Sequence, residues 1–98
     1  MLGLAVQPLT PQIARSLRLD PGVRGVVVTA VDPSSDAAAK GFGRGVVITR
    51  VNNTPVVSAA DLARAVQEAR SAGRKQVLLY VLIQGQPRLV GVDVEAAR

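Results

Sequence analysis

The chain begins Met1-Leu2-Gly3-Leu4-Ala5-Val6-Gln7-Pro8, and the other elements of the sequence can be arranged around this segment. A glycine between two leucines lets the backbone turn sharply and present amide N–H groups outward. Successive outward N–H groups form a nest for an anion, including the carboxylate at the end of a peptide. The apolar residues that follow indicate a short strand, which Pro8 places at the edge of a sheet or at a strand end. The segment therefore predicts a carboxylate-binding turn followed by an edge strand.

A well-marked helix could close a groove against this strand. Ser58 and Asp61 form a Ser-x-x-Asp capping pattern, and Gly73 is placed to end the helix. Between them, Ala59, Leu62, Ala63, Val66 and Ala69 recur at helical spacing. Leu62 and Val66 are explained equally well as core residues, whereas the small Ala59 and Ala63 would leave room for a ligand.

Binding a peptide by strand addition needs a free strand edge, an anion nest and side-chain pockets. The starting segment and the helix together offer all three. The predicted peptide-binding residues are Leu2, Gly3, Leu4, Ala5, Val6, Ala59, Leu62, Ala63 and Val66.

The remaining pattern indicates one small α+β domain, covering residues 1–95, with 96–98 as a frayed C-terminal tail. Thr10 and Pro11 begin a first helix, and Ser35 or Asp36 caps a short helix that ends at Gly41. Two turns are marked, at Asn52-Asn53 and at 84–86. The predicted strands are 2–9, 24–31, 46–51, 76–83 and 88–94, and the one at 24–31 is predicted to be buried. Strands with few helices favour a small curled antiparallel sheet over a doubly wound one.

Composition argues against catalysis and against a bound cofactor or metal. The 98 residues contain no His and no Cys, which removes the usual general base, the usual metal ligands and any disulfide. The serines lack a histidine to activate them, and most of the aspartates fall at predicted caps and turns. No apolar run is long enough to span a bilayer, and no signal peptide is visible. We therefore expect neither an enzyme nor a membrane-inserted segment.

The net charge of +5 raises the possibility of a basic nucleic-acid-binding module. The stretch Gly41-Phe42-Gly43-Arg44-Gly45 could supply a stacking ring and a cation. However, a single phenylalanine offers little surface for stacking bases, and the basic residues are dispersed apart from Arg70, Arg74 and Lys75. A glycine-rich turn and a solvated surface explain the pattern better.

Several stretches carry a family resemblance. They are Leu2-Gly3-Leu4, the run from Val26 to Ala38, the run from Gly45 to Val56, and Ser58 to Leu62. With them, residues 1–95 resemble a PDZ domain of the permuted bacterial kind found in HtrA/Do-type (DegP/DegQ-like) periplasmic serine proteases. Gln7-Pro8-Leu9-Thr10 most resembles the second, C-terminal PDZ of such proteases. The chain departs from the family pattern at Val46, where many members carry an acidic residue, and at Phe42-Gly43.

The resemblance implies a curled, partly open barrel with two main helices and a periplasmic location. It implies a module that captures C-terminal or exposed hydrophobic peptides. Such a module serves substrate recognition, regulation or assembly of a quality-control protease. The expected partners are those peptides, the protease domain that carries the catalytic triad, and a neighbouring PDZ. The alternative is an intramolecular or oligomer-assembly module that binds no free peptide.

Two further expectations follow from this interpretation. A Gly3→Val substitution should abolish binding and leave the fold nearly intact. PDZ domains that select Ser or Thr two residues before the ligand terminus use a His at the head of the groove helix. Because this chain has no His, it should prefer an aliphatic or aromatic residue there, and likewise at the terminus.

Overall fold

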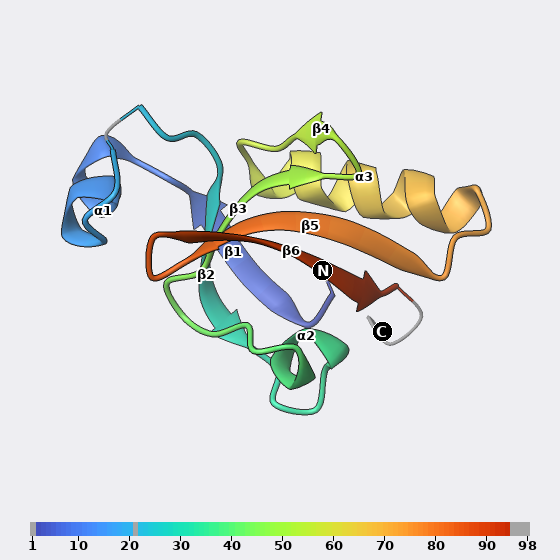
Figure 1. The fold of residues 1–98 in the computed structure, drawn as a ribbon. Helices are drawn as coiled ribbons and strands as arrows, with labels where there is room; N and C mark the ends of the chain where they lie inside the picture. The colour runs from blue at the N-terminus through green and yellow to red at the C-terminus, as the bar shows by residue number, and fades with distance from the viewer. Residues whose placement is uncertain (1, 21, 95–98) are drawn as a thin grey trace.

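A computed structural model of the chain describes residues 2–20 and 22–94. The predicted tail, 96–98, lies outside the described residues. Figure 1 shows six strands and three helices along this part of the chain. In chain order they are β1 (Leu4–Pro8), α1 (Pro11–Ser16), β2 (Val26–Val31), α2 (Asp36–Ala39), β3 (Val47–Val51), β4 (Thr54–Pro55), α3 (Ala59–Ser71), β5 (Gln76–Ile83) and β6 (Gln86–Asp93).

The six strands form one antiparallel sheet, as predicted. Its order is β1-β2-β3-β5-β6, and the two-residue β4 adds to β3. β5 and β6 pair along their whole length, from Gln76↔Asp93 to Ile83↔Gln86. β1 and β2 run across the direction of β5 and β6 in Figure 1, so the sheet is curled. Among the described strands, β1 and β6 each pair with one neighbour, which leaves the sheet open at both ends.

Two tight turns close the predicted hairpins. Asn52 and Asn53, between β3 and β4, have φ angles of 49° and 72°. Gln84 and Gly85, between β5 and β6, have φ angles of 53° and 78°. Left-handed conformations at both central positions match the right-handed twist of the flanking strands. In addition, the Asn52 side-chain oxygen accepts a 2.9 Å hydrogen bond from the Leu78 N–H and so ties this turn to β5.

Each helix starts at the residue that its sequence predicts. The hydroxyl oxygens of Thr10, Ser35 and Ser58 each accept a 3.1 Å hydrogen bond from the backbone N–H three residues later. Such caps satisfy amide groups that have no partner within the helix. α2 and α3 are followed by the left-handed glycines Gly41 and Gly73. At these two ends the backbone bonds are those of a Schellman motif.

The core lies between α3 and one face of the curled sheet. α3 contributes Leu62, Ala65, Val66 and Ala69. Across the sheet, Val26, Ile48 and Val81 are neighbours in register, and all three are buried. Full burial of such a side chain contributes about 1.5–3 kcal/mol. Val27 and Val47 occupy the opposite face by strand alternation and are also buried, so the sheet is covered on both faces there.

The prediction of a buried strand at 24–31 needs correction. The strand predicted at 24–31 begins at Val26, and only Val26 to Val28 are fully buried within it. Thr29 is bulged out of the pairing with β1 and is exposed, and its hydroxyl donates a 3.1 Å hydrogen bond to the Ala5 carbonyl. On α3, Ala65 also belongs to the buried face, whereas Ala59 is exposed.

Candidate functional site

β1 lies at one end of the sheet and packs against α3. Its partner residue Val28 donates its N–H to the Val46 carbonyl, and its carbonyl accepts from the Gly45 N–H, at 2.8 and 2.9 Å. Both bonds of Val28 therefore point towards the β3 side. Val6 stands opposite Val28 in the register, so the N–H and C=O of Val6 face away from β2. β1 thus has an edge that can accept another strand.

The turn before β1 offers a hydrogen-bond donor. Leu2 and Gly3 both have left-handed φ angles, 59° and 74°. The Gly3 carbonyl accepts a 2.8 Å bond from the Asp32 N–H, but the Asp32 carbonyl is taken by the N–H and hydroxyl of Ser35. Within residues 2–20 and 22–94, the Gly3 N–H has no hydrogen-bond partner. This donor sits at the start of the edge strand, where the sequence predicts an anion nest.

The structure brings the large predicted site residues together, but in closed packing. Leu2, Leu4, Leu62 and Val66 belong to one buried cluster, with Val6 packed against its margin. Leu2 and Leu62 are 1% exposed and Val66 is fully buried. A ligand side chain could reach this cluster only if β1 and α3 moved apart or if these side chains rotated. The four residues therefore form an apolar floor that any binding site would share with the core.

The smaller predicted residues are closer to solvent. Ala5 and Ala59 are exposed, and Gly3 and Ala63 are half-buried. Small side chains above an apolar floor leave surface that a ligand can cover without displacing bulky groups. Ala59 and Ala63, on one face of α3, are therefore accessible in the described conformation. Ala5 is exposed as well, but by strand alternation its side chain lies on the face of β1 opposite to Leu4 and Val6.

The expectation that Gly3→Val spares the fold is wrong on steric grounds. A Cβ atom at position 3 would lie 2.6 Å from the Cβ of Ser35 and 3.1 Å from its hydroxyl. The φ angle of 74° is also unfavourable for any residue with a side chain. Gly3 is required by the close approach of β1 to the loop before α2. A valine at this position would disturb the fold as well as any ligand.

Two carboxylates, one in the loop before α2 and one at the start of α2, have lowered pKa values. A backbone N–H and then the hydroxyl of Ser34 donate to Asp32, at 2.9 and 2.8 Å, and lower its pKa. The backbone N–H of Asp93 donates to Asp36 at 2.9 Å and, together with the smaller contribution of Lys40, lowers the pKa of Asp36. Both carboxylates act as acceptors within loops and helix starts. In the described part of the chain, no group of three or more His, Cys, Asp or Glu residues is arranged to hold a metal ion.

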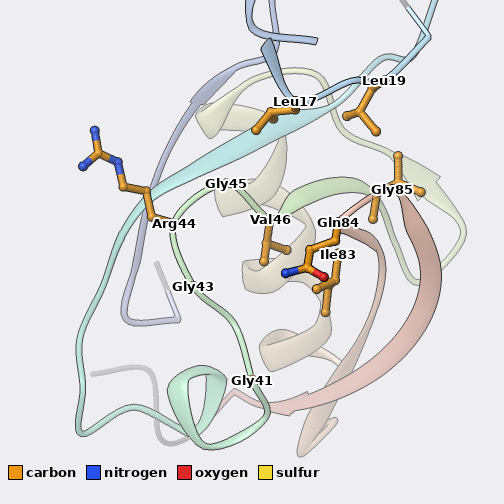
Figure 2. A pocket seen from close by; sticks show the side chains of 11 residues that line it. Leu17, Leu19, Gly41, Gly43, Arg44, Gly45, Val46, Ile83, Gln84 and Gly85 are labelled. Atoms are coloured by element: carbon orange, nitrogen blue, oxygen red, sulfur yellow. The ribbon is translucent and has the colours of Figure 1, made fainter. Parts of the chain in front are cut away.

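A separate pocket of about 290 Å³ lies away from the predicted groove residues. Figure 2 shows Leu17 and Leu19 on one side of it and Ile83, Gln84 and Gly85 on the other. The glycine-rich segment 41–45 forms the remaining wall, and the Arg44 side chain points away from the other labelled side chains. None of the nine predicted peptide-binding residues lines this pocket.

The same segment bears on the nucleic-acid hypothesis. The ring of Phe42 is 5% exposed and belongs to the main core cluster. It therefore cannot serve as a platform on which bases stack. The stretch 41–45 is a connection between α2 and β3, as the simpler interpretation of the sequence predicted.

The family model for the PDZ domain matches residues 1–94. With the curled antiparallel sheet, the glycine turn and the edge strand beside α3, this match defines the class: the chain belongs to the PDZ domain family. PDZ domains are non-catalytic modules of the proteases in which relatives of this chain occur, and catalysis there belongs to another domain.

Known proteins similar to the chain agree with this assignment. The "Probable periplasmic serine endoprotease DegP-like" of Brucella suis biovar 1 (strain 1330) is 46% identical over 71 residues. The aligned region is 72% of this chain but 14% of that relative, so the chain spans a small part of the relative's length.

Two solved structures are also similar. The HtrA3 PDZ domain bound to a phage-derived ligand (FGRWV) has a TM-score of 0.71 and 25% identity, covering 95% of this chain and 82% of that one. The HtrA-type protease AlgW with a decapeptide has a TM-score of 0.73 and 29% identity, covering 95% of this chain and 28% of that one.

These findings confirm the predicted family and fold class. The assignment to the second PDZ of a protease stays a prediction. In the described residues, no helix is both long enough and apolar enough to cross a membrane.

Proposed function

We propose that the domain captures C-terminal or exposed apolar peptide segments by adding them as a strand to the free edge of β1. The observation that carries this proposal is the position of β1, which follows the Gly3 turn and packs against α3, with the backbone N–H and C=O of Val6 facing away from β2. Strand addition uses main-chain hydrogen bonds for affinity and side-chain pockets for selectivity. The HtrA3 PDZ domain and AlgW, both similar in fold, were solved with peptides bound.

Each part of the site has a role in this proposal. The Gly3 N–H, with its neighbours in the turn, receives the peptide carboxylate. The outward N–H and C=O of Val6 bond to the ligand backbone. Ala59 and Ala63 leave space along the wall formed by α3, and the apolar floor of Leu2, Leu4, Leu62 and Val66 takes the terminal side chain. The ligand would then pair with β1 in the antiparallel sense, with its carboxyl end beside Gly3.

The affinity should be modest. A short peptide gains limited apolar contact and loses conformational freedom when it is ordered on the edge. Opening the closed packing around Leu62 and Val66 would add to that cost. We therefore expect a dissociation constant on the order of micromolar.

We further propose that the parent protein is a periplasmic HtrA-type serine protease in which this module is the second PDZ. The module would serve substrate recognition, regulation or assembly beside a protease domain and another PDZ. Support comes from relatives named periplasmic serine endoproteases that are much longer than the matched region.

A titration tests the binding mode. One pentapeptide ending Val-Ala-Val is compared as the free acid and as the C-terminal amide, with amide resonances of residues 2–7 followed by NMR. The free acid should bind at least about tenfold more tightly and perturb Gly3 and Val6, because a charged acceptor strengthens a hydrogen bond. Equal binding of the two forms would exclude the carboxylate nest, and perturbations confined to residues far from β1 would exclude strand addition at this edge.

The closed packing of Leu2, Leu62 and Val66 supports a second candidate, an assembly module that binds no free peptide. This candidate predicts no binding of either peptide form, together with association to the protease domain or to another copy. Sedimentation of the domain alone and mixed with a separately expressed protease domain would distinguish the two.

A further inference from the structure

The opposite end of the sheet, β6, has an edge of the same kind as β1. Ile83 and Gln86 flank a two-residue turn and form a hydrogen-bonded pair, so the bonding alternates from there along β6. By this alternation the backbone groups of Pro87, Leu89, Gly91 and Asp93 face away from β5. β6 is eight residues long. Without some protection, a strand of this length is a template for pairing with another chain.

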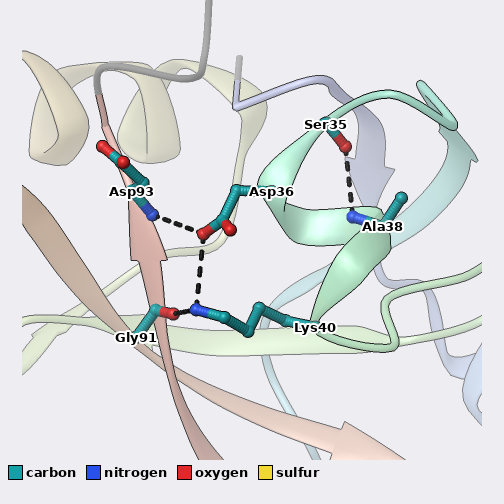
Figure 3. Close-up of polar contacts among 6 residues, drawn as sticks. All are labelled: Ser35, Asp36, Ala38, Lys40, Gly91 and Asp93. Atoms are coloured by element: carbon teal, nitrogen blue, oxygen red, sulfur yellow. Dashed lines mark hydrogen bonds and ion pairs between the residues drawn. The ribbon is translucent and has the colours of Figure 1, made fainter.

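Side chains of α2 occupy part of this edge (Figure 3). The Asp36 carboxylate accepts a 2.9 Å hydrogen bond from the Asp93 N–H. The Lys40 ammonium group donates a 2.8 Å hydrogen bond to the Gly91 carbonyl. The same two side chains are joined to each other at 3.4 Å. Asp36 and Lys40 therefore bond to two of the outward backbone groups that an added strand would use, the Asp93 N–H and the Gly91 carbonyl; we call this pair the edge clamp.

The other outward positions weaken the edge further. Pro87 has no N–H to donate. Of the four outward-facing residues of β6, Leu89 is therefore the one that is neither a proline nor bonded to the edge clamp. Its side chain is 55% exposed. Leu78, on the neighbouring strand and paired with Gly91, is 44% exposed. An apolar edge strand of this kind favours association once its backbone becomes accessible.

We propose that the edge clamp of Asp36 and Lys40 closes β6 to strand addition and so confines an incoming peptide to β1. The inference about where a ligand binds rests on the proposed function, whereas closure of the β6 edge does not. When the clamp is removed, the occupant of the edge is a second copy of the same strand. Two β6 edges can pair antiparallel about a two-fold axis and cover both Leu89 side chains.

The test uses the double variant Asp36→Ala/Lys40→Ala. Arg64→Ala is the matched control, because it likewise removes one partner of an ion pair on a helix, here with Asp61 at 3.8 Å on α3, and in the described residues Arg64 makes no hydrogen bond to a strand. Asp36→Asn is the rescue variant, since its amide oxygen can still accept from the Asp93 N–H. The readouts are amide hydrogen exchange at Asp93, sedimentation across a concentration series, and the stoichiometry of the Val-Ala-Val pentapeptide.

The proposal expects the Asp93 amide to exchange about tenfold or more faster in Asp36→Ala, because the amide loses its hydrogen-bond acceptor. It expects near-native exchange in Asp36→Asn and in Arg64→Ala. The double variant should dimerise with rising concentration while the parent and the control stay monomeric.

Several outcomes would overturn the proposal. They are equal Asp93 exchange in the parent and in Asp36→Ala, or a double variant that folds cooperatively and stays monomeric. A second peptide bound to the parent chain would also contradict closure of β6. If the double variant does not fold, the exchange comparison of Asp36→Ala with Asp36→Asn decides the question. Failure of the parent to bind peptide at all would remove the proposed function but leave the exchange and sedimentation results as tests of the clamp.

Discussion

Gly3 and Ser35 approach so closely that a Cβ atom at position 3 would lie 2.6 Å from the Cβ of Ser35. Ser35 cannot easily retreat, because it is buried, donates its hydroxyl to the Asp32 carbonyl at 2.7 Å and caps α2 through the Ala38 N–H. The turn at the start of β1 is thereby tied to the start of α2. The donor proposed to receive a carboxylate thus adjoins a buried, hydrogen-bonded part of the fold.

Gly3→Ala should therefore destabilise the domain by about 2–4 kcal/mol, combining steric overlap with a left-handed conformation. Gly73→Ala is the control, since Gly73 has a nearly equal φ of 76° but no atom within 4 Å of the added Cβ. The control should cost only about 1–2 kcal/mol. Urea unfolding of both variants measures the difference. Equal losses would mean that the contact with Ser35 adds nothing.

Local signals in the sequence predicted the start and end of most elements. The caps at Thr10 and Ser58 and the turn at Asn52-Asn53 depend on side chains and φ preferences within a few residues. Such signals do not depend on the tertiary fold. The antiparallel sheet followed from the many strands and few helices, and the PDZ-like fold followed from the family resemblance; the order of the strands in the sheet was not predicted.

Features that depend on distant contacts were not predictable in the same way. The bulge at Thr29 exists because β1 and β2 must stay paired while both curl, and no local pattern marks it. The bond from Lys40 to Gly91 joins residues 51 positions apart. For the candidate site, the sequence placed Leu62 and Val66 beside β1 but could not show that their packing is closed.

Substitutions on α3 should separate stability from binding. Leu62→Ala removes a side chain that is 1% exposed, so it should cost about 2–5 kcal/mol. Ala59→Glu changes an exposed residue and should alter stability by no more than about 0.5 kcal/mol, while it abolishes binding of the Val-Ala-Val pentapeptide.

Ala60→Glu is the control for Ala59→Glu. It makes the same change at an exposed alanine that shares a helix face with Arg64 and Gln67. It should leave both stability and binding unchanged. Isothermal titration and thermal unfolding report the two properties. Normal binding by Ala59→Glu would remove α3 from the proposed groove.

Acid should weaken the domain through Asp32 and Asp36. Both have folded-state pKa values lowered from the ordinary 3.8. The unfolded chain therefore binds protons more readily than the folded chain, and stability falls as the pH drops from about 4 through the lower folded-state values. The double variant Asp32→Asn/Asp36→Asn should have a flatter profile between pH 5 and pH 2. Urea midpoints at several pH values measure this, and an unchanged slope in the variant would contradict the assignment.

Ligand selectivity should follow from the aliphatic character of the α3 face. The proposed groove residues on α3 are Ala59, Leu62, Ala63 and Val66, none of which can hydrogen-bond through its side chain. On the strand side, the Thr29 hydroxyl already donates to the Ala5 carbonyl. A ligand hydroxyl buried two residues before the carboxyl terminus would lack a partner, at a cost of about 1–3 kcal/mol. An aliphatic side chain would instead gain up to about 1.5–3 kcal/mol from burial.

Two pentapeptides that differ only by Val or Thr at that position test this selectivity, because the two side chains are nearly equal in shape. The Val peptide should bind at least about fivefold more tightly. Ala63→Ser is a useful companion variant, since it adds a hydroxyl on the groove face of α3. This hydroxyl can hydrogen-bond to the Thr side chain of the ligand, so the preference for the Val peptide over the Thr peptide should become smaller. Amidated forms of both peptides control for binding that does not use the carboxylate. Tighter binding of the Thr peptide by the parent domain would place a polar partner in the groove and would require a different set of residues to face the ligand.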